Sequence, residues 1–139
     1  MSDAFDLQRF VDAQAGVWGA VQAELEKGCK RTHWMWFVFP QLAVLGRSAT
    51  ARHYGLASLD AARAYWAHPL LGPRLKACCA QLLALRGRSL QQIFGSPDDL
   101  KLRSCMTLFE RAAPDEPVFA QVLERYCGGQ RDPLTLAAL

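Results

Sequence analysis

Residues that begin and end helices recur along the whole chain, and they constrain its fold more than any other feature of the sequence. A serine or aspartate precedes a proline or an apolar run at Ser58, Ser89, Ser96 and Asp132. Glycines follow apolar runs at Gly28, Gly87, Gly95 and Gly128. Serine and aspartate side chains accept hydrogen bonds from the free N–H groups of a helix start, and glycine adopts the left-handed conformation that ends a helix. The pattern therefore predicts an all-α fold.

The spacing of apolar residues supports the same fold class. Between positions 7 and 25 apolar residues recur at steps of three and four, the period of an α-helix. We expect Asp6 to cap this helix and Gly28 to end it. Further apolar runs follow each of the later start residues, and the chain contains no internal repeat or linker. We therefore expect one compact domain over residues 1–139, a bundle of about seven or eight short-to-medium helices.

The aromatic segment 33–39 is ambiguous. It is apolar on all sides, so its spacing fits a buried strand as well as a buried helical turn. Pro40 ends it in either case, because proline disfavours helix at the preceding residue. Since no nearby segment resembles a partner strand, we expect one to two helical turns.

Composition excludes several classes of protein. Hydrophobic residues make up 51% and charged residues 21%, as in globular proteins, and no apolar run approaches the roughly 18 residues of a membrane span. The N-terminus carries acids where a signal peptide would be basic, and the five cysteines form no C-x-x-C pair. A reduced, cytoplasmic protein is expected. The net charge of +3 is scattered, which permits an anionic ligand but does not indicate a nucleic-acid partner.

No cofactor or metal site is expected. The three histidines His33, His53 and His68 are widely spaced, and no H-x-x-x-H pair occurs. No pair of carboxylates has a spacing typical of acid–base catalysis.

Polar residues cluster first around the aromatic segment. Lys30, His33, Trp34, Trp36 and Gln41 combine a cation, an imidazole and two indoles with an amide. Lysine supplies charge and tryptophan a stacking surface, so together they could hold an anionic ligand that contains a ring. The alternative is that both tryptophans belong to the core and His33 bonds a backbone carbonyl.

Two further clusters lie at expected helix starts. Ser48 follows Gly46 and Arg47, where backbone N–H groups could meet an anion, although no Walker sequence is present. His68 and Arg74 flank a proline-containing helix start and could meet a phosphate or carboxylate. The alternatives are an ordinary capping turn at Ser48, and a capping His68 with a solvated Arg74.

The last cluster contains Lys101 and Ser104, one helical turn apart. The order K-x-x-S is the reverse of the S-x-x-K motif of serine hydrolases that use a lysine. This order favours ligand binding by the two side chains over nucleophilic catalysis by Ser104.

Four segments resemble blocks of a bacterial family of unknown function, domain-of-unknown-function family eighteen-ten, whose members are sometimes labelled calpastatin. The first is Gly-Cys-Lys-Arg-Thr-His-Trp-Met-Trp-Phe-Val-Phe-Pro-Gln at 28–41, and the others lie at 68–75, 94–109 and 129–136. The resemblance covers nearly the whole chain and implies a mainly helical single domain. The family usually has Ser-Ser where this chain has Ser104-Cys105, so a role that needs a hydroxyl at position 105 is not expected.

These observations lead to two hypotheses. The first is a site for a small anionic molecule, such as a nucleotide or an ADP-ribose-like ligand. If the protein is an enzyme, we expect a hydrolase acting on a glycosidic or phosphate linkage. A general similarity in layout to NADAR proteins, which are associated with NAD and ADP-ribose metabolism, points the same way. The second hypothesis is a non-enzymatic protein-interaction domain, in which the motif residues serve the structure.

Overall fold

The computed structural model describes residues 3–139, and within this range the chain forms ten α-helices and one 3-10 helix. Their bounds are α1 Gln8–Ala15, α2 Trp18–Lys27, α3 Met35–Val38, η1 Ala43–Leu45, α4 Ala49–His53, α5 Leu59–Ala67, α6 Leu71–Ala84, α7 Leu90–Phe94, α8 Asp98–Ala112, α9 Val118–Cys127 and α10 Pro133–Ala138. The only β feature among these residues is an isolated bridge between Leu42 and Leu56. The all-α prediction is confirmed, and the predicted count of seven or eight helices is too low.

The single helix expected over residues 7–25 is wrong. The chain breaks at Gly16 and Val17, so that α1 contacts α3 whereas α2 contacts α6. One straight helix could not reach both partners, and glycine lowers the cost of the break because of its poor helix propensity. Gly28 ends α2 in the left-handed conformation with φ 70°, as predicted.

The start of α1 also differs from the prediction. Asp6 has a positive φ of 51° and does not cap the helix. The carboxylate of Asp3 takes that role, accepting hydrogen bonds from the backbone N–H of Leu7 at 2.7 Å and of Gln8 at 2.9 Å. The turn before α1 thus brings the start of the helix onto the side chain of Asp3, three residues before Asp6.

Later helix starts follow the sequence rules closely. Ser58 and Ser89 accept hydrogen bonds from the third residue of their helices, and Ser89 completes a capping box with Gln92. Asp132 caps α10, with Pro133 at its first position. Ser96 does not cap α8, whose preceding residue is Pro97. The starts of α5, α7 and α10 therefore follow local chemistry, whereas the start of α8 does not.

The aromatic segment forms one helical turn, α3, which confirms the expectation of a helix rather than a strand. Trp34, Met35, Val38 and Phe39 are all buried, and Trp34 and Phe39 both pack against Phe94 of α7. This short element carries half-buried Trp36 on its remaining face.

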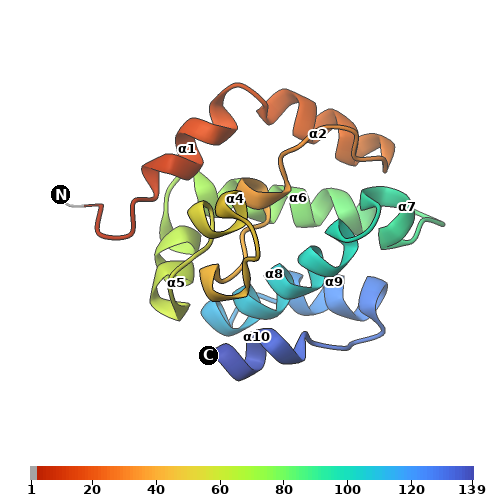
Figure 1. The fold of residues 1–139 in the computed structure, drawn as a ribbon. Helices are drawn as coiled ribbons and strands as arrows, with labels where there is room; N and C mark the ends of the chain where they lie inside the picture. The colour runs from red at the N-terminus through yellow and green to blue at the C-terminus, as the bar shows by residue number, and fades with distance from the viewer. Residues whose placement is uncertain (1–2) are drawn as a thin grey trace.

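Helix α8 lies in the middle of the bundle, as Figure 1 shows, and contacts α5, α7, α9 and α10. Most of its second half is buried, including Cys105, Met106 and Phe109. Its first half is less covered, and there the loop around η1 and the final helix α10 approach it. A pocket lies at this end of α8.

All five cysteines are free thiols, and Cys78, Cys79 and Cys105 are buried. Burial raises the pKa of Cys78 to about 12, which keeps the thiol protonated and unreactive. Among residues 3–139, none of the helices is both long and apolar enough to cross a membrane.

Candidate functional site

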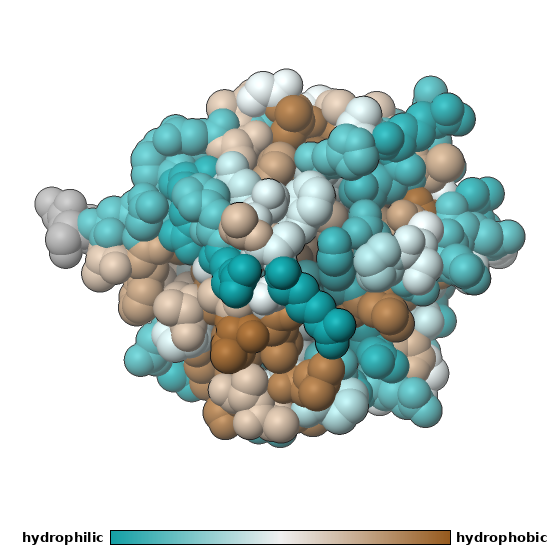
Figure 2. All heavy atoms as spheres, in the orientation of Figure 1, coloured by the Kyte–Doolittle hydropathy of each residue, from teal (hydrophilic) through white to brown (hydrophobic). Residues whose placement is uncertain are grey.

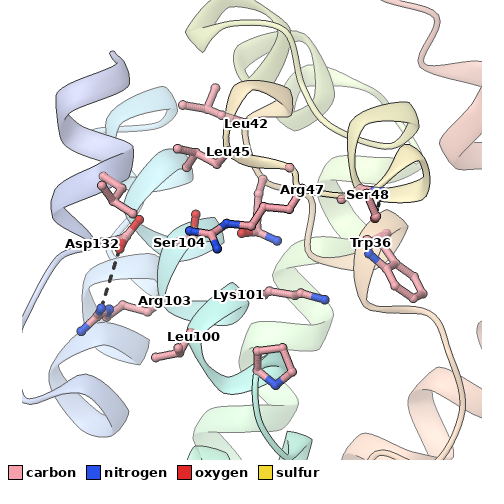
Figure 3. A pocket seen from close by; sticks show the side chains of 15 residues that line it. Trp36, Leu42, Leu45, Arg47, Ser48, Leu100, Lys101, Arg103, Ser104 and Asp132 are labelled. Carbon is pink, nitrogen blue, oxygen red and sulfur yellow. Dashed lines mark hydrogen bonds and ion pairs between the residues drawn. The ribbon is translucent and has the colours of Figure 1, made fainter.

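A pocket of about 680 Å³ lies between the first half of α8, the aromatic turn α3, the loop from Gln41 to Ala51 and the start of α10 (Figure 3). Its volume is within the range typical of small-molecule sites. Segments that are far apart in the sequence meet here, because α3, the η1 loop and α10 all approach the same end of α8.

The walls of the pocket are largely apolar. Leu42 and Leu45 line it from the η1 segment, and Leu100 and Leu134 line it from α8 and α10. The last two are 55% and 64% exposed, so two large apolar side chains stand in water at this site. Figure 2 shows apolar side chains gathered over η1 and α10 on this face, with hydrophilic side chains along their upper edge.

One side of the pocket holds Lys101 above Trp36. The Lys101 ammonium lies 5.0 Å from the centre of the Trp36 ring and 3.2 Å from the Asp98 carboxylate. The other oxygen of Asp98 lies 3.0 Å from the ammonium of Lys30, whose side chain is only 8% exposed. Asp98 therefore bridges two lysines and fixes Lys101 against the indole.

The opposite side contains Arg103 and Asp132, drawn with a dashed line in Figure 3. Their closest atoms are 3.7 Å apart, longer than a hydrogen bond. Asp132 already accepts the backbone N–H and the hydroxyl of Thr135 on its other oxygen. The buried Nε of Arg103 has no hydrogen-bond partner among the described residues. Arg103 thus keeps unused donor capacity next to the pocket.

The hydroxyl of Ser104 belongs to the same polar network. Its Oγ lies 2.9 Å from Oγ1 of Thr135, which donates to Asp132. Ser104 must then donate its hydroxyl proton to Thr135. This arrangement ties the start of α10 to α8 and supplies no base to Ser104.

The loop before α4 carries Arg47 and Ser48. Arg47 is exposed, lines the pocket and forms no ion pair with any described residue. Ser48 lines it too, but its hydroxyl accepts the N–H of Ala51 at 3.0 Å and so caps α4. Gly46 packs closely on α4, where a Cβ atom would lie 3.1 Å from the backbone of Ala51. These contacts hold the loop against α4, with Arg47 at the pocket.

Of the ten residues predicted to form the site, five line this pocket: Trp36, Gln41, Ser48, Lys101 and Ser104. Lys30 stands just behind it through its ion pair with Asp98. The remaining four lie elsewhere. His33 is exposed outside the pocket, and Trp34, His68 and Arg74 have structural partners.

Trp34 is fully buried, and its indole N–H donates to Glu24 at 3.0 Å. The Glu24 carboxylate also accepts the backbone N–H groups of Arg31 and Thr32 and the Thr32 hydroxyl. Burial raises the pKa of Glu24, but these hydrogen bonds outweigh it and lower the value to about 2. Glu24 therefore stays ionised and holds the turn that leads into α3.

His68 and Arg74 lie at the start of α6. The His68 Nδ1 accepts the backbone N–H of Leu70 at 3.0 Å and so caps the helix. Arg74 donates to the buried Gln14 at 3.2 Å and stacks on Trp18 at 4.7 Å. The capping alternative for His68 thus fits the structure, whereas Arg74 is neither a solvated surface charge nor a pocket residue, because it packs on Trp18 and bonds Gln14.

The roles of Glu24, Arg103 and Asp132 described above were not predicted from the sequence. Glu24 had a signal, because it falls three residues after Val21 on the apolar face of its helix. Asp132 was recognised only as a helix cap, and its approach to Arg103 depends on how α10 docks. Among residues 3–139, no group of three histidine, cysteine, aspartate or glutamate side chains could hold a metal ion.

Comparison with known proteins identifies the family but no activity. No curated protein matches the chain. The crystal structure of the conserved hypothetical protein Rv1873 from Mycobacterium tuberculosis is 54% identical in sequence, covers 99% of this chain and 98% of its own, and superposes with a TM-score of 0.97. The family model described as "protein of unknown function (DUF1810)" matches residues 4–139. The protein therefore belongs to the DUF1810 family, as the motif blocks in its sequence predicted.

Proposed function

We propose that the pocket at the first half of α8 binds a small anionic molecule that contains a planar ring, such as a nucleotide or an ADP-ribose-like compound. The observation that carries this proposal is one pocket of about 680 Å³ that combines apolar walls, a half-buried indole and three cationic side chains, Arg47, Lys101 and Arg103.

Each part of the ligand has a complementary surface. A ring can pack on Trp36 or against the leucines, because apolar walls gain most from covering flat hydrocarbon surface. An anionic group can take hydrogen bonds from arginine, whose planar fork matches phosphate and carboxylate oxygens. The side chains of Gln41 and Ser104 provide neutral hydrogen-bonding groups near the centre of the pocket. A purely apolar ligand would leave the cations unused.

Hydrolysis of a glycosidic or phosphate linkage remains the reaction we expect if the protein is an enzyme. Asp132 lines the pocket and Asp98 pairs with Lys101 beside it, and both carboxylates are engaged by cations or by a helix start. Ser104 donates its proton towards Thr135 and Asp132, away from any histidine. These contacts favour binding over nucleophilic catalysis by Ser104.

Calorimetric titration with AMP, ADP-ribose and NAD tests the binding proposal. A nucleotide present at a hundred times its dissociation constant should stabilise the fold by about 2.7 kcal/mol, which corresponds to a rise in melting temperature of roughly 10 °C or less for a domain of this size. Lys101→Met removes the charge above Trp36 and should weaken binding about tenfold or more.

Lys76→Met is the matched control. Lys76 also pairs with a carboxylate, Glu116 at 2.7 Å, but it lies on α6 outside the pocket. Equal binding by wild type and Lys76→Met, with weaker binding by Lys101→Met, supports the site. If a folded protein binds none of the three compounds at millimolar concentration, the proposal fails.

The rival proposal, a protein-interaction domain, draws on the exposed apolar side chains Val44, Leu100 and Leu134 around the same site. Exposed apolar groups of this size occur at docking surfaces. Substitution of Leu134 by serine separates the two proposals. It should abolish capture of a protein partner under the rival proposal, whereas the affinity for a nucleotide held by the cations should fall only a few-fold.

A further inference from the structure

The charges around the pocket do not cancel. Four cations, Lys30, Arg47, Lys101 and Arg103, and two carboxylates, Asp98 and Asp132, lie in the pocket or directly next to it. We call these six residues the charge cluster. Nearby Arg131 pairs with Glu110 and Glu124, outside the pocket lining, and adds no positive charge. The cluster therefore carries two positive charges more than it can balance internally.

Of the two excess charges, one belongs to Lys30 and Lys101, which share Asp98, and one belongs to Arg47, whereas the unused hydrogen-bonding capacity lies on Arg47 and Arg103. Lys30 and Lys101 share Asp98 at 3.0 and 3.2 Å, so both ammonium groups have a close anionic partner. Arg103 has only a 3.7 Å approach to Asp132 and a buried Nε without a partner among the described residues. Arg47 has no ion pair with them at all. Arginine forks, rather than the lysines, are left to meet an anion.

The placement of the two arginines fits one extended anionic group. Figure 3 shows Arg47 reaching from the η1–α4 loop towards α8, the helix on which Arg103 stands. Both arginines line the same pocket. The Trp36 and Lys101 side of the pocket is then free for a ring.

We propose that the pocket selects ligands with two negative charges on phosphate, bound by Arg47 and Arg103, and that Arg47 sets this charge preference. This inference rests on the binding function proposed above and narrows it to two classes. One is a phosphate monoester, which carries about two charges above its second pKa of about 6. The other is a pyrophosphate diester, which carries one charge on each phosphorus. A nucleoside triphosphate carries about four negative charges, which is more than the two excess positive charges of the charge cluster.

A series with one base and a varied phosphate charge tests the proposal. Adenosine, cyclic AMP, AMP, ADP and ATP, with about zero, one, two, three and four charges at pH 8, are titrated calorimetrically together with ADP-ribose, which carries two. We expect the highest affinity for AMP or ADP-ribose, and no gain from AMP to ATP. Arg47→Gln should lower the affinity for AMP about tenfold, because one cation and its hydrogen bonds are lost. The affinity for cyclic AMP should stay within about twofold, because this ligand lacks the second charge that Arg47 is proposed to bind.

Arg52→Gln is the control variant. Arg52 is an exposed arginine on α4, in the chain segment next to Arg47, but it does not line the pocket. Arg52→Gln removes the same charge from the same region of the surface. If the order of affinities is unchanged in this variant, the charge preference depends on contact with Arg47 and not on the electrostatic field of the whole surface.

The possible failures are distinguishable. If affinity rises steadily from AMP to ATP, or if Arg47→Gln weakens cyclic AMP and AMP equally, the charge preference is wrong while the nucleotide site stands. If none of the compounds binds to a protein with a normal melting transition, the binding function itself is overturned, and the inference with it.

Discussion

Two tryptophans that stand two residues apart in the sequence occupy opposite environments. Trp34 is fully buried, and its indole N–H is one of four donors to the Glu24 carboxylate. Trp36 is half-buried on the other face of α3, beneath Lys101, and lines the pocket. One aromatic turn thus supplies both a core anchor and a wall of the candidate site.

The two regions differ most in how completely their polar groups are satisfied. Around Trp34 the Glu24 carboxylate is saturated by donors from a single turn. Around Trp36 the cations outnumber the carboxylates, and the Nε of Arg103 lacks a partner among residues 3–139. Since buried polar groups are normally paired, saturation is typical of a structural role, and spare capacity is typical of a place where something else binds.

The largest effect that should separate the two regions is on stability. Glu24→Gln removes a charge that accepts four hydrogen bonds and turns one acceptor into a donor facing N–H groups. We expect the free energy of unfolding to fall by about 3 kcal/mol, as measured by urea denaturation. Glu26→Gln, an exposed substitution on the same helix, should change it by less than about 0.5 kcal/mol. Equal stability of the two variants would contradict the role assigned to Glu24.

The lowered pKa of Glu24 predicts that the free energy of unfolding depends on pH. The pKa of Glu24 is about 2 in the folded chain, below its ordinary value of 4.5. A lowered pKa means that the group stabilises the fold fully above pH 4.5 and that this contribution is lost as the pH falls towards 2. At pH 3 about 2 kcal/mol of it should be gone. Because other acids also titrate, the measured quantity is the difference between wild type and Glu24→Gln, which should shrink across this window.

Much of the fold could be predicted from local sequence, for reasons visible in individual residues. Gly28, Ser89 and Asp132 act within one turn of their own position, so their effect on the helix can be read without knowing the tertiary structure. The break at Gly16 could not be predicted in this way. It depends on α1 and α2 having different partners, and that information is spread over the whole chain.

The candidate site was only partly visible for the same reason. Lys101 and Ser104 could be proposed because they lie one helical turn apart on a single element. The pairing of Arg103 with Asp132 depends on α10 docking against α8, which no spacing reveals. Trp34 and Trp36 could not be told apart, because a one-turn helix of apolar residues does not indicate which face meets the core.

The smallest and most selective effects are expected from substitutions of the two tryptophans, one of which should change binding and the other stability. Trp36→Leu removes the ring under Lys101 and should weaken nucleotide binding about tenfold, since stacking of a base on an aromatic side chain contributes roughly 1–3 kcal/mol. Its free energy of unfolding should change by less than about 1 kcal/mol, because Trp36 lies at the edge of the core and is only partly buried. Trp34→Phe should do the reverse, lowering stability through the lost hydrogen bond to Glu24 while the folded fraction binds with unchanged affinity. Affinity is measured by calorimetry and stability by denaturation on the same preparations.

If both variants lose affinity and stability in parallel, the two faces of α3 are not separate in function, and the pocket is a by-product of core packing rather than a binding site.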